Sequence, residues 1–244
     1  MAANPKQLRV LHAHHAGPDT RVLEVECCDG GAFDVVGGKY VIVHTGLTIG
    51  DKAIKRAYSL MPLAGRPSHA SIAVKRFHGP GSRALHEVTA GRVLGFSGPW
   101  GKLVPDDGLA ERTLLVATDT GITSALGIVE QSALGSGPRP VEVLWLRQGG
   151  ETFLDLPSVQ ARTERAGVPF VSAEVPAVDA PSRPDAAWHL VDARARALAV
   201  THVVATGDGA IVHPLRERLP QRVPSVRDVR IECFFRNPEK KSVS

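Results

Sequence analysis

The sequence has few cysteines and few aromatic residues, and both shortages limit the chemistry open to it. Its three cysteines, Cys27, Cys28 and Cys233, do not make up the set of thiolates that an iron–sulfur cluster needs. Two of them are neighbours in the chain, so we expect no disulfide framework and a reducing compartment. Aromatic residues make up 5% of the chain, and no basic stripe is interleaved with them, which argues against nucleic-acid binding.

Long apolar runs are also missing. No apolar stretch approaches the roughly 20 residues that span a membrane, and the N-terminus lacks the apolar core of a signal peptide. We therefore expect a soluble, cytoplasmic protein with no membrane contact. His12 and His14 have no carboxylate spaced to complete a metal site, so no metal is predicted.

The chain has 244 residues, of which 43% are hydrophobic, and its formal net charge is +4. This length suits two ordinary domains, each with a core of its own. Lysines and arginines are scattered along the chain. A small positive excess of this kind suits an anionic cofactor or an acidic protein partner.

The first hundred residues consist of short apolar or alternating segments separated by Gly, Pro and Asp turns. Short strands at this spacing are typical of an antiparallel β-barrel. A short helix is expected at residues 82–88, with Ser82 as its N-cap and His86 on its outer face. The strands are expected at residues 8–11, 21–25, 40–43, 71–75 and 92–96.

After residue 105 strand and helix patterns alternate, which indicates a parallel sheet with helices on both faces. The sequence thus predicts a β-barrel domain at residues 1–105 and a Rossmann-like α/β domain at residues 106–244. Residues 176–184 are expected to form a loop. The α/β strands are expected at residues 113–117, 141–146, 168–173, 203–205 and 229–234, and the helices up to about residue 134 and at 157–165, 194–198 and 211–219.

One short strand carries three side chains that could bind a phosphorylated aromatic ring. Arg56 is a strong partner for phosphate. Tyr58 lies two residues on, so it points to the same face of the strand and could cover a ring. Ser59 could hydrogen-bond to a ring nitrogen. Taken alone, the segment is equally consistent with an ordinary strand that has a surface Arg and a packed Tyr.

Two glycine-containing segments follow. Residues 79–82 read Gly-Pro-Gly-Ser and could bind a pyrophosphate where a short helix begins. Residues 96–101 read Phe-Ser-Gly-Pro-Trp-Gly. By itself, each segment is more often a plain turn.

The order of these segments resembles the ferredoxin–NADP reductase family of flavin-dependent electron-transfer proteins. Family members carry an Arg-x-Tyr-Ser motif, a pyrophosphate loop and a Gly-Pro-aromatic-Gly turn in this order. Here they correspond to residues 56–59, 79–82 and 98–101, and residues 38–41 (Gly-Lys-Tyr-Val) stand where the family usually has Gly-Gln-Tyr-Val. The resemblance continues into the α/β part at residues 115–123, 206–209 and 232–235.

The resemblance implies specific roles. Arg56 would bind the flavin phosphate, Tyr58 would pack on the isoalloxazine, and Ser59 would lie near the reactive ring nitrogen. Ser59, Thr206 and Phe235 are the residues expected at the transfer site. The flavin is expected to be FAD, and the nucleotide NADP or NAD. The other residues expected to bind these cofactors are Ala57, Val74, Lys75, Arg76, Gly81, Ser82, Thr118, Thr120, Gly121, Ile122, Arg147, Gly207 and Asp208.

The sequence departs from the family pattern at the nucleotide site. Asp119 stands where the family usually has Gly, Ser124 where it often has Pro, and Thr206 where it typically has Cys. A carboxylate about 4 Å from a phosphate charge costs roughly 4 kcal/mol before screening, unless an Arg or Lys compensates. Arg147 could recognise the 2′-phosphate of NADP, but Glu174 offers an acid where a base would help.

The resemblance implies a flavoenzyme that moves electrons between NAD(P)H and a separate one-electron carrier such as ferredoxin or flavodoxin. The cysteine count means that no iron–sulfur carrier is fused to this chain. Two alternatives stay open. One is a flavin-binding subunit of a redox complex with an impaired nicotinamide site, and the other is a reductase of free flavin.

Overall fold

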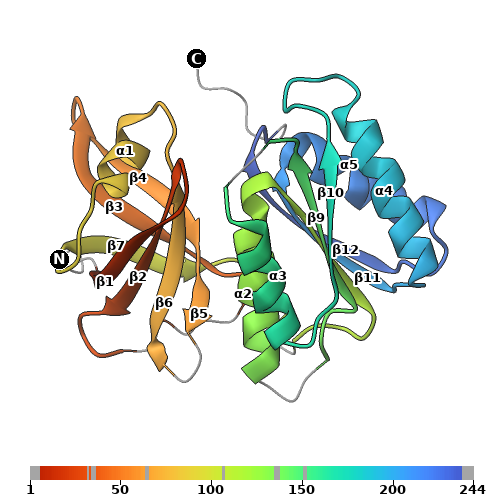
Figure 1. The fold of residues 1–244 in the computed structure, drawn as a ribbon, viewed down its shortest axis with the longest axis horizontal. Coiled ribbons are helices and arrows are strands. Elements are labelled where there is room, and N and C mark those ends of the chain that lie inside the picture. Colours follow the sequence, from red (N-terminus) through yellow and green to blue (C-terminus); the bar gives the residue numbers. More distant parts are fainter. Residues whose placement is uncertain are drawn as a thin grey trace.

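The computed structural model of the chain describes residues 6–31, 33, 37–63, 66–105, 108–134, 138–150 and 153–237. An antiparallel β domain and a parallel α/β domain lie side by side (Figure 1). The predicted two-domain fold class is therefore confirmed. The expected boundary, between residues 105 and 106, falls in the connection from β7 (Val93–Trp100) to β8 (Thr113–Thr118).

The N-terminal domain is one curled seven-stranded sheet in the order β4-β3-β7-β1-β2-β6-β5. Buried and part-exposed residues alternate along its strands, and the buried side chains, such as Leu23, Ile72 and Phe96, fill the inside of the curl. Strand β4 lies at one edge of this sheet, where it pairs with β3. The strands are β1 (Lys6–Gly17), β2 (Thr20–Cys27), β3 (Tyr40–Ile49), β4 (Lys52–Ser59), β5 (Met61–Leu63), β6 (Arg66–Lys75) and β7.

Helix α1 (Pro80–His86) differs from the sequence prediction at both ends. Gly79, not Ser82, is its N-cap, and Pro80 opens the first turn, where its missing N–H costs nothing. His86 is buried rather than on the outer face. The hydroxyl of Ser82 instead holds the preceding loop, because it accepts from the Phe77 amide at 3.1 Å and reaches the Phe77 and Gly79 carbonyls.

The C-terminal domain is a five-stranded parallel sheet in the order β10-β9-β8-β11-β12. The chain runs outward from β8 on one side, then crosses to β11 on the other, so the strand order reverses between β8 and β11. In such sheets ligands bind outside the carboxyl ends of the strands at this point. The remaining elements are η1 (Asp119–Gly121), α2 (Ile122–Leu134), β9 (Glu142–Gln148), α3 (Leu156–Arg165), β10 (Phe170–Val175), α4 (Arg183–Ala197), β11 (His202–Asp208), α5 (Gly209–Arg222) and β12 (Asp228–Phe235).

Helices α2 and α3 cover the face of this sheet nearer the β domain, and α4 and α5 cover the other (Figure 1). Helix α4 is far longer than expected, since it begins at Arg183. Ala187, Trp188, Val191 and Ala195 are buried against the sheet at helical spacing. The segment 176–184, which was expected to be a loop, is a loop only up to residue 182, because α4 begins at Arg183.

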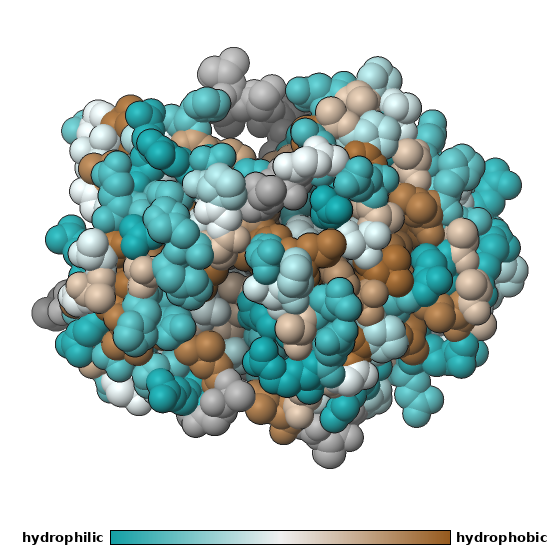
Figure 2. Space-filling view, in the orientation of Figure 1, coloured by the Kyte–Doolittle hydropathy of each residue, from teal (hydrophilic) through white to brown (hydrophobic). Residues whose placement is uncertain are grey.

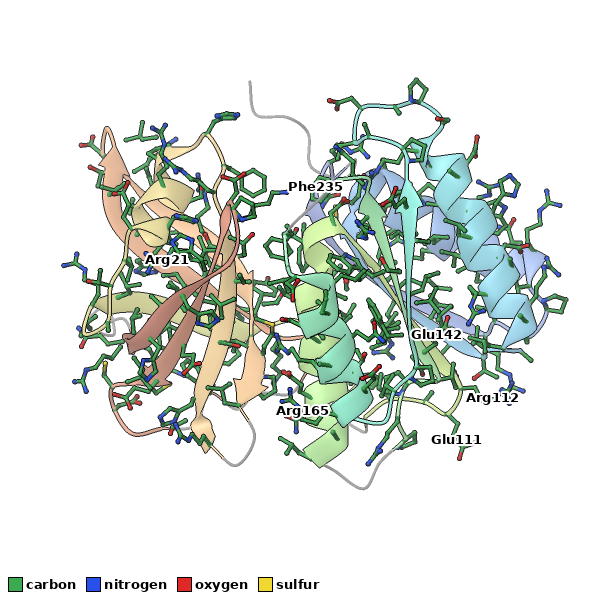
Figure 3. All side chains as sticks on the ribbon, in the orientation of Figure 1. Arg21, Glu111, Arg112, Glu142, Arg165 and Phe235 are labelled. Carbon is green, nitrogen blue, oxygen red and sulfur yellow. The ribbon has the colours of Figure 1, made fainter. Side chains whose placement is uncertain are left out.

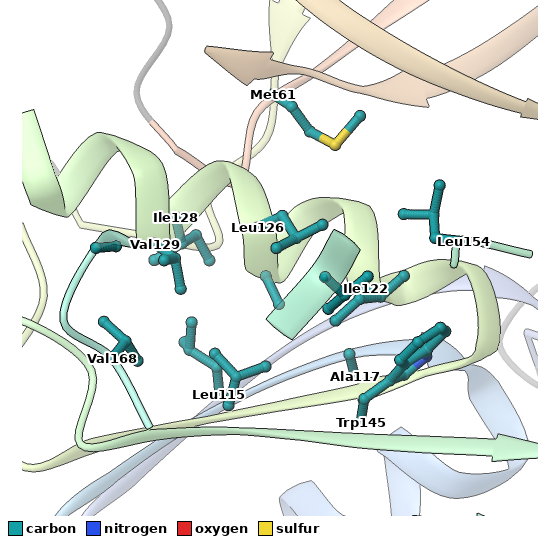
Figure 4. Close-up of a cluster of buried hydrophobic side chains, with 14 of the residues drawn as sticks. Met61, Leu115, Ala117, Ile122, Leu126, Ile128, Val129, Trp145, Leu154 and Val168 are labelled. Carbon is teal, nitrogen blue, oxygen red and sulfur yellow. The ribbon is translucent and has the colours of Figure 1, made fainter. Parts of the chain in front are cut away.

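The two domains share one apolar core. Met61 of β5 packs with Leu126 of α2 in a cluster that also includes Val22 and Ala73 of the β domain (Figure 4). The backbones approach closely, because a Cβ at Gly127 would lie 2.5 Å from the Leu60 carbonyl oxygen. Glycine at 127 thus lets α2 rest directly on the β domain.

Candidate active site

A cavity of about 660 Å³ lies between the two domains at the carboxyl ends of the parallel strands. Figure 2 shows the surface hollowed between the domains toward the top of the view, and Figure 3 shows Phe235 at this end of the α/β domain, on the side that faces the β domain. Both domains contribute walls. The lining residues are Tyr40, Ile42, Arg56, Ala57, Tyr58, Ser59, Ala73, Lys75, Phe77, Gly79, Ser82, Thr120, Thr123, Phe153, Glu232, Cys233, Phe234 and Phe235.

The β-domain wall is built on β4. The Arg56 guanidinium lies over the turn before α1, because a Cβ at Gly79 would be 3.6 Å from Arg56 Nη2 and one at Gly81 3.3 Å from Arg56 Cζ. Arg56 and the segment 79–82, which the sequence predicts to bind phosphate, therefore lie together although they are far apart in the chain. Burial raises the pKa of Tyr58 and the Arg56 charge lowers it, with burial the larger effect, so the phenol stays neutral.

This wall fits a phosphorylated aromatic cofactor. Lys75 and Arg56 supply two cations to the cavity, and Tyr58 supplies a ring. At Gly81 a Cβ would come within 2.7 Å of Ile54 Cγ2, so only glycine lets this turn sit so close to the guanidinium. The turn and the strand are therefore shaped to approach a phosphate group together.

A chain of hydroxyl and carboxyl groups crosses from one domain to the other. Ser59 Oγ of β4 lies 3.3 Å from Ser124 Oγ of α2. Ser124 in turn hydrogen-bonds to Glu232 of β12. Burial raises the pKa of Glu232 from 4.5 to about 7, although the Ser124 hydrogen bond acts in the opposite direction. Glu232 Oε2 is shielded from solvent and has no hydrogen-bond partner among the described residues.

The end of β12 supplies the opposite wall. Cys233, Phe234 and Phe235 all line the cavity, and Cys233 Sγ donates to the Phe235 carbonyl at 3.1 Å. Cys233 is therefore a cavity residue, although a position on the last strand of a sheet would ordinarily make it a core thiol. Burial and the Glu232 charge raise the pKa of Tyr40 across the cavity.

The carboxyl ends of β8 and β11 are hydrogen-bonded to each other and to η1 at the point where the strand order reverses. Asp208 N donates to Thr118 Oγ1 at 2.7 Å, and Thr206 Oγ1 donates to the Gly121 carbonyl at 3.0 Å. A Cβ at Gly207 would lie 2.4 Å from the Thr118 carbonyl oxygen. The hydroxyl of Thr118, expected at the nucleotide, thus holds β8 to the end of β11, and that of Thr206, expected at the transfer site, holds β11 to η1.

Asp119 is compensated by a charge that lies far away in the sequence. Its carboxylate pairs with Arg183, which is fully buried and also lies 3.2 Å from Asp208. Arg236 binds both oxygens of Asp208. The negative charge of Asp119 is thus compensated by a buried guanidinium, that of Arg183. We call Asp119, Arg183, Asp208 and Arg236 the switch-point network.

The structure brings together eight of the sequence-predicted residues at the cavity: Arg56, Ala57, Tyr58, Ser59, Lys75, Ser82, Thr120 and Phe235. Val74 and Ile122 are buried in the apolar cores, while Arg76 is exposed. Arg147 lies at the end of β9, where it pairs with Glu174 at 3.2 Å. Thr118, Gly121, Thr206, Gly207 and Asp208 are not among the described residues that line the cavity.

Sequence reasoning gave no role to Glu232 and Ser124, which form the polar path with Ser59, or to Thr123 and Phe153, which line the cavity. One signal was available, since Glu232 is an acid that directly precedes the Cys-Phe-Phe end of β12. In the described parts of the chain no group of three or more His, Cys, Asp or Glu residues could hold a metal ion. None of the helices described is both long and apolar enough to cross a membrane.

Comparison with known proteins agrees with this geometry. Residues 7–104 match the family model of the oxidoreductase FAD-binding domain. Ferredoxin–NADP reductase B of Sorangium cellulosum (strain So ce56) is 33% identical over 131 residues, which are 53% of each protein. The chain thus spans about half the length of this curated relative.

Solved structures share the fold at lower identity. Phthalate dioxygenase reductase superposes with a TM-score of 0.69 at 21% identity, over 93% of this chain and 67% of that one. CYP116B46 from Tepidiphilus thermophilus gives a TM-score of 0.68 at 23% identity, over 94% of this chain and 29% of that one. The predicted resemblance is therefore confirmed: residues 7–104 are similar to the oxidoreductase FAD-binding domain, and the chain as a whole shares the two-domain fold of the solved reductase structures.

Proposed function

We propose that this protein is a flavin-dependent oxidoreductase that takes electrons from NAD(P)H and passes them one at a time to a separate carrier of the ferredoxin or flavodoxin kind. One observation carries the proposal. Arg56, Tyr58 and Ser59 of the FAD-binding domain face Glu232 and Phe235 of the α/β domain across a single cavity. A flavin and a nicotinamide can meet only where both domains supply walls.

The β-domain wall would hold FAD. Arg56 and Lys75 would bind its phosphates, Tyr58 would pack on its ring, and Ser59 would donate to a ring nitrogen. A bound flavin accepts two electrons from a nicotinamide and can release them singly. The protein's own part is to position the two reactants and to keep water out.

The path from Ser59 through Ser124 to Glu232 would move a proton between the cavity and the carboxyl group. Glu232 suits this role because its pKa of about 7 lets it both give and take a proton near neutral pH. Its shielded Oε2 leaves room for a further hydrogen bond inside the cavity. Phe235 stands on the same strand as Glu232 and would cover the ring from the α/β side.

The electron carrier is proposed to be a separate protein. The three cysteines lie at the end of β2 and in β12, and no cluster-binding group occurs among the described residues. The relative from Sorangium cellulosum is named a ferredoxin–NADP reductase. The net charge of +4 suits an acidic carrier.

The test is an anaerobic titration of the purified protein with NADH and with NADPH, following the flavin absorption band at about 450 nm. A yellow protein that bleaches, and then reduces an added one-electron acceptor, supports the proposal. A yellow protein that neither nucleotide bleaches would be a flavin-binding subunit. Loss of flavin on desalting, with activity on added free flavin, would identify a free-flavin reductase. A colourless protein that takes up no FAD refutes all three.

A further inference from the structure

We propose that Glu174, held by Arg147, makes this protein select NADH over NADPH; this rests on the proposed function and names the nucleotide that it uses. In dinucleotide-binding sheets the adenosine ribose is read near the ends of the strands that follow the first Gly-rich loop. There a carboxylate accepts from the ribose 2′-hydroxyl, or an arginine binds the 2′-phosphate. The choice between NAD and NADP is thus made by the charge at this place.

Arg147 and Glu174 lie at that place. They face each other in register on the neighbouring parallel strands β9 and β10, near the carboxyl ends. The Glu174 carboxylate reaches over the end of β9, because a Cβ at Gly149 would lie 3.0 Å from Glu174 Oε2. The Glu174 carboxylate of β10 therefore lies over the carboxyl end of β9.

The acid is the exposed member of the pair. The Glu174 side chain is 60% exposed and that of Arg147 is 20% exposed. Arg147 is held on two sides, since Nε donates to Ser172 Oγ at 3.0 Å and Nη2 lies 3.2 Å from Glu174 Oε1. An incoming ribose at this edge would meet a carboxylate before it met the guanidinium.

The other arginines described at this edge are already engaged. Arg183 is fully buried between Asp119 and Asp208, and Arg236 is bound to Asp208 and to the Val178 carbonyl. Asp179 adds a further carboxylate, whose charge acts on Arg236. Neither Arg183 nor Arg236 can bind a 2′-phosphate without breaking its ion pair with a carboxylate.

The 2′-phosphate of NADPH carries about two negative charges near neutral pH. It would face Glu174 and compete with it for Arg147. The 2′-hydroxyl of NADH would instead donate to the Glu174 carboxylate, which is a charge-assisted hydrogen bond. Glu174 thus favours the binding of NADH and disfavours the binding of NADPH, and specific sites commonly combine these two effects.

The experiment measures binding of NAD⁺ and NADP⁺ to the flavin-loaded full chain by isothermal titration calorimetry, so that no turnover is needed. The wild type should bind NAD⁺ at least about tenfold more tightly. Glu174→Gln removes the charge and keeps the shape, so NADP⁺ affinity should rise by about tenfold while NAD⁺ affinity falls slightly. The matched control is Glu164→Gln in the last turn of α3, which should change neither.

A double variant checks the part played by Arg147. If Glu174→Gln frees the guanidinium for the phosphate, then adding Arg147→Ala should abolish the gain in NADP⁺ affinity. Wild-type protein that binds NADP⁺ as tightly as NAD⁺ overturns the inference, and so does a Glu174→Gln variant that shifts both nucleotides equally. If neither dinucleotide binds to any variant, the nucleotide site itself is absent, and the proposed function fails together with the inference.

Discussion

At the scale of single residues, the Arg-x-Tyr-Ser motif at residues 56–59 was predictable because it is local. Arg56 and Tyr58 lie two positions apart on one strand, so spacing alone places them on the same face, and Ser59 follows directly. The polar path was not predictable in this way. Ser59 and Ser124 are 65 residues apart and Glu232 lies on the last strand, so their meeting depends on how the domains pack. The same holds for the Asp119–Arg183 pair, whose members are 64 residues apart.

Replacing Arg56 should release the flavin. Arg56→Ala removes the guanidinium that lies over the 79–81 turn, and a phosphate that loses a charge-assisted partner binds about tenfold more weakly or worse. The measurement is the flavin-to-protein absorbance ratio after desalting. Arg83→Ala is the control, because Arg83 is an exposed arginine of α1 that does not line the cavity. Equal flavin content in the two variants would contradict the assigned role.

Replacing Asp119 should destabilise the protein. Asp119→Ala leaves Arg183 buried without one of its carboxylates, and breaking a buried ion pair costs about 3–5 kcal/mol. Asp119→Gly should be less harmful than Asp119→Ala by about 1 kcal/mol, because residue 119 has a φ of +48° that glycine adopts freely. Urea unfolding curves measure both differences. A stability equal to that of the wild type in either variant would show that the pair contributes nothing.

Because of the raised pKa of Glu232, the free energy of unfolding should fall as the pH rises from about 4.5 to about 7. Below 4.5 the carboxyl is protonated in the folded and the unfolded chain alike. Between the two values the unfolded chain loses the proton and the folded protein keeps it, so unfolding becomes easier by roughly 3 kcal/mol in total.

The measurement is the free energy of unfolding at several pH values for the wild type and for Glu232→Gln. The variant should show a flatter profile over this window, because its amide does not titrate. Glu164→Gln, on the exposed end of α3, should keep the wild-type profile. A wild-type profile in Glu232→Gln would mean that another group is responsible.

At the scale of elements, the strands were predicted better than the helices. The alternating or continuous apolar runs located the strands of both sheets except β4, which was expected only from the segment at residues 56–59, and the three-residue β5, which is too short to leave a pattern. Helix α4 was largely missed because Pro181, Pro184 and several alanines precede its apolar face. Pro184 is tolerated because it stands in the first turn of the helix, where no N–H partner is required.

The contact between α2 and the β domain should not tolerate a side chain at residue 127. Gly127→Ala would place Cβ 2.5 Å from the Leu60 carbonyl, so the helix must move away from β5. Ser59 and Ser124 lie on the two sides of the same contact and would separate. We expect a loss of about 1–3 kcal/mol in stability, by overpacking, together with weaker FAD binding.

Calorimetry and flavin fluorescence measure these two effects. Ser132→Ala is the control on the same helix, since its hydroxyl bonds to the Val129 carbonyl one turn back. If Gly127→Ala binds FAD as the wild type does, the interdomain contact does not shape the flavin site.

At the scale of the whole molecule, the candidate active site is formed by both domains together. Its walls come from β4 and β6 on one side and from η1, α2 and β12 on the other. Sequence patterns predict each domain because the patterns are properties of single elements. They do not predict the cavity, whose shape depends on Met61 and Leu126 packing across the interface.

This shared core predicts how the protein unfolds. Because Val22, Met61 and Ala73 are buried in the same cluster as residues of α2, separating the domains would expose apolar surface in both. Scanning calorimetry should therefore show a single transition, with a van't Hoff enthalpy close to the calorimetric enthalpy. FAD at about 100 times its dissociation constant should raise the stability of that one transition by roughly 2.7 kcal/mol. Arg56→Ala should show the same single transition without the shift. Two transitions, of which FAD moves only one, would show that the domains fold independently and that the cavity between them is not fixed by the core.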